Sequence, residues 1–225
     1  MKKNYFVFIF LTSVNFIFSQ NAFTGIQFNP VWGSEKLDLD KKYTLKDDVI
    51  SISKLKFYVS DVRLKKEGKT IYKTQKKSFL IDLESRLKID FDENMTENFD
   101  EIQFNIGVDS LTNVSGAMGE DLDPSNGMYW SWQSGYINFK VEGKSEELSS
   151  AHKDFQFHVG GYSKPFETLQ MVVLPMKSSQ NVIFLDILQF FTQIDVSRIH
   201  SVMSPGEKAV VLAGQFQKIF YTDSK

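Results

Sequence analysis

Short stretches in which apolar and polar residues alternate recur along this 225-residue chain, and this period of two limits the fold more than any other feature. In the clearest case, segment 102–109, Ile, Phe, Ile and Val at the even positions alternate with polar or small residues. Successive side chains of a strand point to opposite faces, so this pattern predicts strands buried on one face. Further expected strands are 22–29, 50–64, 70–72, 79–83, 137–141, 155–159, 169–174 and 182–188.

Many short strands separated by Gly, Pro and Asn are typical of a sandwich or barrel. We expect an all-β fold, a β-sandwich of antiparallel strands, about eight to ten in number. Residues 84–98 are charged and are expected to form a connection. Residues 204–207 (Ser-Pro-Gly-Glu) match a capping box with proline in the first turn, and apolar residues follow at helical spacing. One short C-terminal helix is therefore expected to pack on the sandwich.

The first 20 residues have the organisation of a secretory signal peptide, with Lys2 and Lys3 at the start and an apolar stretch after them. The alternative is an N-terminal membrane anchor. The apolar stretch is shorter than the roughly 20 residues that span a bilayer, however, and polar residues at 12, 13 and 15 interrupt it. We therefore expect a single mature domain over residues 21–225, periplasmic or secreted, that does not span a membrane.

Composition excludes several classes of function. The chain has no cysteine, which excludes disulfides, thiolate metal sites and cysteine nucleophiles. Its 26 basic and 28 acidic residues are nearly balanced, so the charge does not indicate nucleic acid as a partner. The run of Lys73, Lys76 and Lys77 is interpreted as a solvated strand edge or turn. No signature of a hydrolase nucleophile, a nucleotide-binding loop or a zinc protease is present, so we expect no enzymatic activity.

The segment 110–135 lacks alternation and is long for a connection within one domain, which is typical of a functional, ordered loop. It leads into the stretch GMYWSWQSGY (residues 127–136, the WxW motif), which contains Trp130, Trp132 and Tyr136. Aromatic side chains bury large areas, and Tyr and Trp also carry a polar group that needs a partner. The WxW motif is thus either the centre of a core or the wall of a site.

Candidate metal ligands are few. Of the three histidines, His158 lies opposite the apolar face of segment 155–159. His200 has no partner at strand or helix spacing, and His152 lies in a polar loop and is expected to be exposed. The structural alternative for His158 is a hydrogen-bonding residue on a solvated strand face. Residues 120–127 (EDLDPSNG) resemble a calcium loop but lack its glycine at position six and glutamate at position twelve. A turn with Asx hydrogen bonds explains them better.

Several motifs in one order resemble the MbnP-like family of exported bacterial proteins, in its Bacteroidetes-type branch. They are LKFYVSDV (55–62), FNIGVD (104–109), LDP (122–124), the WxW motif, Glu142-Gly143 and FHVGG (157–161). The resemblance implies a periplasmic or surface-associated β-sandwich that binds copper. It also implies a di-haem, cytochrome peroxidase-like partner that oxidises a tryptophan to kynurenine, and outer-membrane transport components as further partners.

Carried over residue by residue, His158 matches the histidine of F-H-x-G, and Trp130 and Trp132 match the two tryptophans. We expect a Cu(I) ion to use His158 with thioethers from Met118 and Met128, with Met203 as a further candidate. Tyr136 is expected to line the site. Asp109, Asn113 and Asp123 are expected to support the loop. The chain departs from copper-binding relatives at Asn113-Val114, where they tend to have Asn-His.

A different class of function stays open beside this one. A secreted β-sandwich can bind carbohydrate or another protein without any metal, and the 110–135 loop would then be its contact surface. Under that hypothesis Trp130 and Trp132, two residues apart, would share one face of a strand and be exposed to the ligand.

Overall fold

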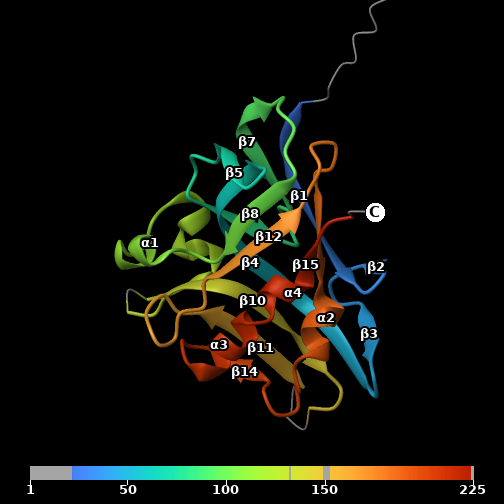
Figure 1. Ribbon diagram of the computed structural model, residues 1–225. Coiled ribbons are helices and arrows are strands. Elements are labelled where there is room, and N and C mark those ends of the chain that lie inside the picture. Colours follow the sequence, from blue (N-terminus) through green and yellow to red (C-terminus); the bar gives the residue numbers. More distant parts are fainter. Residues whose placement is uncertain (1–21, 132, 149–152, 224–225) are drawn as a thin grey trace, which may run out of the picture.

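The computed structural model describes residues 22–131, 133–148 and 153–223. Two β-sheets pack face to face with a phenylalanine-rich core between them (Figure 1). The signal peptide expected over residues 1–20 lies outside the described residues. No helix in the described ranges is long and apolar enough to cross a membrane.

The larger sheet is built around β4 (Asp48–Lys66), a 19-residue strand whose length lets it pair with several partners. Its main order is β12-β8-β4-β10-β11-β14, and β3, β5 and β6 pair with β4 while β9 pairs with β10. The bounds are β3 (Lys42–Leu45), β5 (Lys69–Lys73), β6 (Ser78–Asp82), β8 (Glu101–Ile106), β9 (Tyr129–Ser131), β10 (Gly135–Ser145), β11 (Asp154–Gly160), β12 (Gln170–Pro175) and β14 (Ser201–Val202).

The smaller sheet has the order β15-β13-β1-β2, with β7 paired to β1. Its strands are β1 (Phe23–Trp32), β2 (Glu35–Lys36), β7 (Lys88–Met95), β13 (Val182–Asp186) and β15 (Phe220–Tyr221). Most pairs in both sheets are antiparallel, as expected, but β1 with β13 and β11 with β14 are parallel. These parallel pairs join segments that are far apart in the chain.

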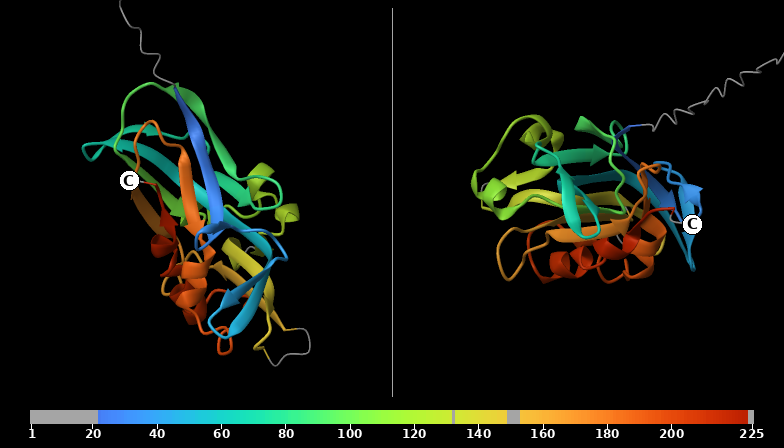
Figure 2. Two further views of the ribbon diagram at one scale, coloured as in Figure 1. Left: turned by 90° about the vertical axis from the view of Figure 1, so that its right-hand side faces the viewer. Right: turned by 45° about the horizontal axis from the view of Figure 1, so that its top comes forward.

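Helices lie on both sides of the larger sheet. Figure 2 shows α2 (Ile187–Thr192), α3 (Glu207–Ala213) and α4 (Phe216–Ile219) on one side, with α1 (Ser110–Val114) and the green loops on the other. The expected C-terminal helix is α3, which is followed by the single turn of α4. It begins at Glu207 with Gly206 at the N-cap and no side-chain cap, so the capping box predicted at residues 204–207 is wrong.

The all-β sandwich prediction is confirmed, and each expected strand is found within a few residues. The prediction of a connection over 84–98 is wrong, because β7 occupies most of it. Only Ile89 of β7 is buried, since β7 pairs through its backbone with β1 and exposes charged side chains. A strand whose side chains are mostly exposed shows no alternation of apolar and polar residues. The expected strand 182–188 ends at Asp186, whose carboxylate accepts the Gln189 N–H and caps α2.

Candidate functional site

The segment after β8 folds onto the face of the larger sheet that is turned away from the small sheet, the outer face. There it forms a second apolar cluster, separate from the main core. Its buried members come from β4, β6, β10 and the long loop, and Tyr129 and Trp130 pack against them. They are Tyr58, Leu80, Val108, Leu122, Met128, Tyr136 and Ile137. The described part of the loop thus packs on the sheet, and Met128, Tyr129, Trp130 and Tyr136 of the WxW motif belong to this cluster.

The side chain of Tyr136 binds the backbone in the middle of the long loop. Its side chain is 1% exposed, and its hydroxyl accepts the Met118 N–H at 3.0 Å and lies 3.0 Å from the Leu122 carbonyl. The Tyr58 ring meets it edge-on at 5.7 Å, and the Tyr58 hydroxyl donates to the Asp121 carbonyl at 2.9 Å. Burial raises the pKa of both phenols above their usual value, so both remain hydrogen-bond donors.

Asn113 joins the start of the loop to β10. Its amide nitrogen donates to the carbonyls of Val108 and Asp109, at 2.9 and 3.0 Å, and its amide oxygen accepts the Tyr136 N–H at 2.8 Å. The side chain is 2% exposed. Asp109 is the N-cap of α1 and accepts from both the backbone N–H and the hydroxyl of Thr112. Both side chains therefore bind backbone groups of the loop; the supporting role expected for them at a site stays a prediction.

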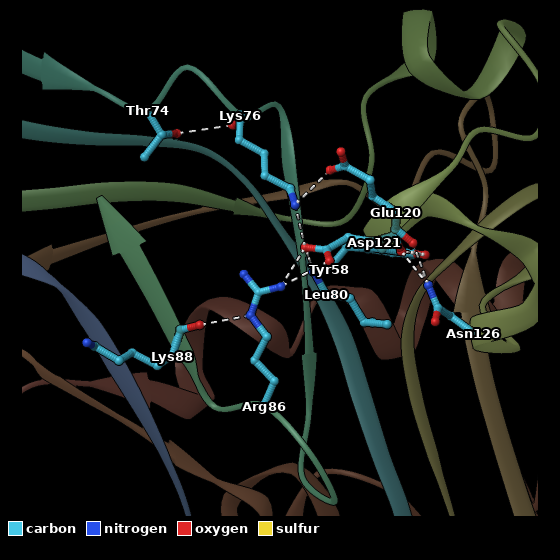
Figure 3. A network of polar contacts seen from close by, with 9 residues as sticks. All are labelled: Tyr58, Thr74, Lys76, Leu80, Arg86, Lys88, Glu120, Asp121 and Asn126. Atoms are coloured by element: carbon cyan, nitrogen blue, oxygen red, sulfur yellow. Dashed lines mark hydrogen bonds and ion pairs between the residues drawn. The ribbon is translucent and has the colours of Figure 1, made fainter. Parts of the chain in front are cut away.

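The carboxylate of Asp121 attaches the part of the loop around residues 120–122 to β6 and Arg86 (Figure 3). Asp121 of the 3₁₀ turn η1 (Glu120–Leu122) accepts the Leu80 N–H at 3.1 Å and both of its oxygens lie 3.0 Å from Arg86 Nη1. Asp121 therefore occupies a backbone donor at the free edge of β6, which protects that edge from further pairing. Asp123, expected as a loop support, caps η2 (Pro124–Asn126) by accepting the Ser125 N–H at 2.8 Å. This is an Asx turn.

Trp130 lies on β9, which pairs with the start of β10. Its ring packs so closely on Gly160 that a Cβ there would lie 2.8 Å from Trp130 Cζ3. The indole Nε1 is buried and has no hydrogen-bond partner among the described residues. A buried indole N–H normally has one. Trp132 lies outside the described residues.

His158 lies on β11, on the same face as Gly160, because the two are two residues apart on a strand. It is 7% exposed, and its Nε2 is 2.6 Å from Glu142 Oε1 on the neighbouring β10. Burial lowers the pKa of His158 below its ordinary value, and this outweighs the opposing effect of Glu142. The imidazole is therefore neutral at pH 7, the form in which histidine binds metals.

Lys140 connects His158 to the WxW motif. It is the residue opposite His158 in the β10–β11 register, and its ammonium donates to the carbonyl of Gly127, the first residue of the motif. Burial lowers the pKa of Lys140. Glu142 also pairs with Lys54 at 3.5 Å, so a carboxylate and two ammonium groups surround the imidazole.

The other candidate metal ligands, which are methionines and the two remaining histidines, belong to different parts of the chain. Met128 is fully buried in the second cluster, next to Gly127, whereas Met118 is 43% exposed and lies beside Ser78 and Lys76. Met203 and His200 are exposed, and His152 lies outside the described residues. The described ranges contain no group of three or more His, Asp or Glu side chains arranged for a metal. Among the described residues, His158 is thus the buried histidine candidate, and the thioethers of Met118 and Met128 lie in other parts of the fold.

A family model described as MbnP matches residues 21–204. The chain belongs to the MbnP family. Among solved structures, MbnP from Methylosinus trichosporium matches with a TM-score of 0.62 and 15% sequence identity, over 83% of this chain and 86% of that one. At this identity the likeness shows a shared fold. The comparison with curated proteins gave no match.

Three residues around His158 were not among the predicted site residues: Lys140, and also Glu142 and Gly160, which were noted only as parts of the resemblance motifs. All three lie in the β10–β11 pair, and their relation to His158 depends on the strand register. Pairing segment 137–141 with 155–159 as a hairpin would have placed Lys140 and Glu142 on the His158 face. The shift in register between Ile137 and Phe139 could not have been foreseen.

Proposed function

We propose that this protein is an exported, non-enzymatic member of the MbnP family that handles a metal, with copper as the ion. The observation that carries the proposal is the arrangement at His158. Its imidazole is neutral, oriented by Glu142, and lies on the same strand face as Gly160, on which the Trp130 ring packs. Carboxylates that hydrogen-bond one imidazole nitrogen commonly orient the ring for a metal bound at the other.

In this proposal His158 Nδ1 is the nitrogen that binds Cu(I), because Nε2 is taken by Glu142. Met128 is the thioether candidate that we favour, since Lys140, opposite His158 in the strand register, binds the carbonyl of the adjacent Gly127. The ammonium groups of Lys140 and Lys54 oppose a cation, and Glu142 offsets part of that charge. A low charge and a low coordination number both favour Cu(I) over divalent ions here.

Trp130 is the tryptophan that we propose as the one modified by a di-haem partner. Its buried indole N–H without a described partner supports this choice, because the ring is held by packing rather than by a hydrogen bond. Intact-mass analysis of protein purified from its native host tests it. We expect a mass change localised by peptide sequencing to Trp130; an unmodified Trp130 would contradict this part of the proposal.

A Cu(I) titration tests the metal itself. The mature protein competes with a chromophoric Cu(I) chelator in the absence of oxygen. We expect binding that weakens at least about tenfold in His158→Ala, which is about 1.4 kcal/mol. His200→Ala, which removes an exposed histidine, is the matched control and should not change the affinity. Equal affinity of wild type and His158→Ala, or no competition at all, would refute the copper proposal.

A metal-free binding module is the second candidate. The observation that favours it is the apolar surface on and beside α1, where Leu111, Val114 and Met118 are 69%, 63% and 43% exposed. Exposed apolar patches commonly mark contact surfaces. Trp130, in contrast, is half-buried. A protein that binds no Cu(I) but loses binding to a carbohydrate array or partner when Leu111 and Val114 become serine would favour this candidate.

A further inference from the structure

A hollow of about 370 Å³ lies on the outer face, next to the second cluster at Leu122. It opens between the start of β6, α1 and the turn that precedes η1. The residues that line it include Lys76, Lys77, Ser78, Thr112, Met118 and Glu120. Its size is within the range of sites for small molecules.

Ser78 lines this hollow with a polar atom that lacks a partner. The residue is 3% exposed, and its Oγ makes no hydrogen bond with any described residue. Ser60, opposite it on β4, cannot supply one readily, because its own hydroxyl donates to the Gly107 carbonyl at 2.7 Å. The Oγ atom is closed to solvent, and a buried hydroxyl without a partner costs about 1–3 kcal/mol, so an acceptor that reaches it from the hollow is stabilised.

The charges around the hollow favour an anion. Lys76 is shared between Glu120 at 3.3 Å and Asp121 at 3.2 Å, and Asp121 is already neutralised by Arg86. Lys77 is exposed and forms no ion pair within the described part of the chain. The side chain of Glu120 is 83% exposed, so breaking its ion pair with Lys76 costs little free energy. The hollow thus offers one unpaired ammonium, one exchangeable ammonium and one free hydroxyl.

We propose that this hollow binds a small oxyanion, a carboxylate or a phosphate. The Ser78 hydroxyl donates to one oxygen, and the ammonium of Lys77 pairs with another. The exposed thioether of Met118 forms an apolar wall that suits the carbon skeleton of an organic acid. The site is independent of copper, because none of these residues contacts His158, Glu142 or Lys140.

Two-dimensional NMR of the ¹⁵N-labelled mature protein tests the proposal, with sodium phosphate and sodium citrate added separately at constant ionic strength. We expect at least one anion to shift the amide resonances of Ser78, Thr112 and Gly119 in a saturable manner. Ser78→Ala and Lys77→Gln should each weaken binding at least about fivefold. Lys208→Gln, at an exposed lysine on α3, is the charge control and should bind as wild type does. Which anion saturates at the lower concentration identifies the phosphate or the carboxylate class.

Thermal unfolding provides a second measurement that does not depend on resonance assignment. Without anion, Ser78→Ala should be as stable as wild type or more stable, because it removes an unsatisfied hydroxyl. With anion, only wild type and Lys208→Gln should gain stability. The proposal is overturned if no saturable shift occurs with either anion, or if Ser78→Ala and Lys77→Gln respond as wild type does. A hollow that holds only water would give that result.

Discussion

Asn113 is the single residue on which the attachment of the long loop depends most. Its side chain satisfies the Val108 carbonyl and the Tyr136 N–H at once, in a site closed to water. Asn113→Ala leaves both groups unpaired, so we expect a loss of about 3 kcal/mol in the free energy of unfolding, measured by urea titration. The neighbouring Val114→Ala, at a 63% exposed side chain, is the control and should change stability little. A loss below about 1 kcal/mol for Asn113→Ala would mean that water replaces the amide.

Asp61 gives the stability a predictable dependence on pH. It lies at a bulge in β4 with φ of 51° and pairs with Arg63 at 2.6 Å and Lys73 at 2.8 Å. Partial burial raises its pKa, but the bonds from Lys73 and Arg63 outweigh this and leave the pKa below its usual value. The carboxylate therefore adds stability above about pH 4, and this contribution disappears as the pH falls through the lowered pKa.

Asp61→Asn isolates that contribution, since asparagine also tolerates a positive φ. We expect wild type to exceed Asp61→Asn by about 0.5 kcal/mol at pH 7, because the pairs are partly exposed and screened. The difference should shrink toward zero as the pH falls through the lowered pKa of Asp61, and also in 1 M salt. A difference that is unchanged by acid would show that the effect comes from the backbone bulge and not from charge.

At this scale the sequence indicated residues of the loop but not the contacts around His158. Asp109, Asn113 and Asp123 were expected as loop supports, and each side chain binds backbone groups of the loop, while their role at a site stays a prediction. The Glu142–His158 and Lys140–Gly127 contacts were not foreseen. These contacts depend on the register of β10 against β11 and on the conformation of the loop around Gly127. The local pattern of apolar and polar residues predicts neither.

At the scale of elements, the short strand β9 is held against the β10–β11 pair by the contact of Trp130 with Gly160. A Cβ at Gly160 would lie 2.5 Å from the Tyr136 carbonyl oxygen and 2.8 Å from the Trp130 ring. Gly160→Ala must therefore displace the ring, and we expect a loss of about 1–3 kcal/mol. The ¹⁹F resonance of 5-fluorotryptophan at position 130, assigned with Trp130→Phe, should shift.

Gly119→Ala is the matched control, because an added Cβ there would meet nothing within 4 Å and its backbone φ of −94° suits alanine. It should leave both the ¹⁹F spectrum and the stability of the protein unchanged. If Gly160→Ala also leaves the ¹⁹F resonance in place, the ring is not held by this contact.

Elements with strong alternation were predictable because burial on one face decides their conformation. β3, β7, β9, β14 and β15 were not, because they are short or exposed and their conformation comes from backbone pairing with other strands. The helix cap at residues 204–207 failed for a related reason. The local pattern predicts a helix from Pro205, but the apolar residues of α3 must also reach the core, and the helix begins two residues later, at Glu207.

At the scale of the whole molecule, the C-terminal segment closes the sandwich, although the match to the MbnP family ends at residue 204. Phe216 packs against Phe139 with ring centroids 4.7 Å apart. Phe220 of β15 meets Phe28, Phe57 and Phe104, at 5.7–6.2 Å, and so contacts both sheets. Removing this segment would expose the centre of the main core. A family boundary is thus not a folding boundary here.

We therefore expect a mature chain that ends at residue 204 to lose its cooperative unfolding transition and its dispersed NMR spectrum. A mature chain that ends at Asp223 is the control and should fold as the full-length chain does, since β15 and the bond from Thr222 to the Pro175 carbonyl are retained. Phe216→Ala is the graded version, because it keeps the segment but leaves a cavity, with an expected cost of about 3–5 kcal/mol. If the chain ending at residue 204 unfolds cooperatively near the wild-type temperature, the two sheets hold the core without this segment, and its aromatic contacts serve another purpose.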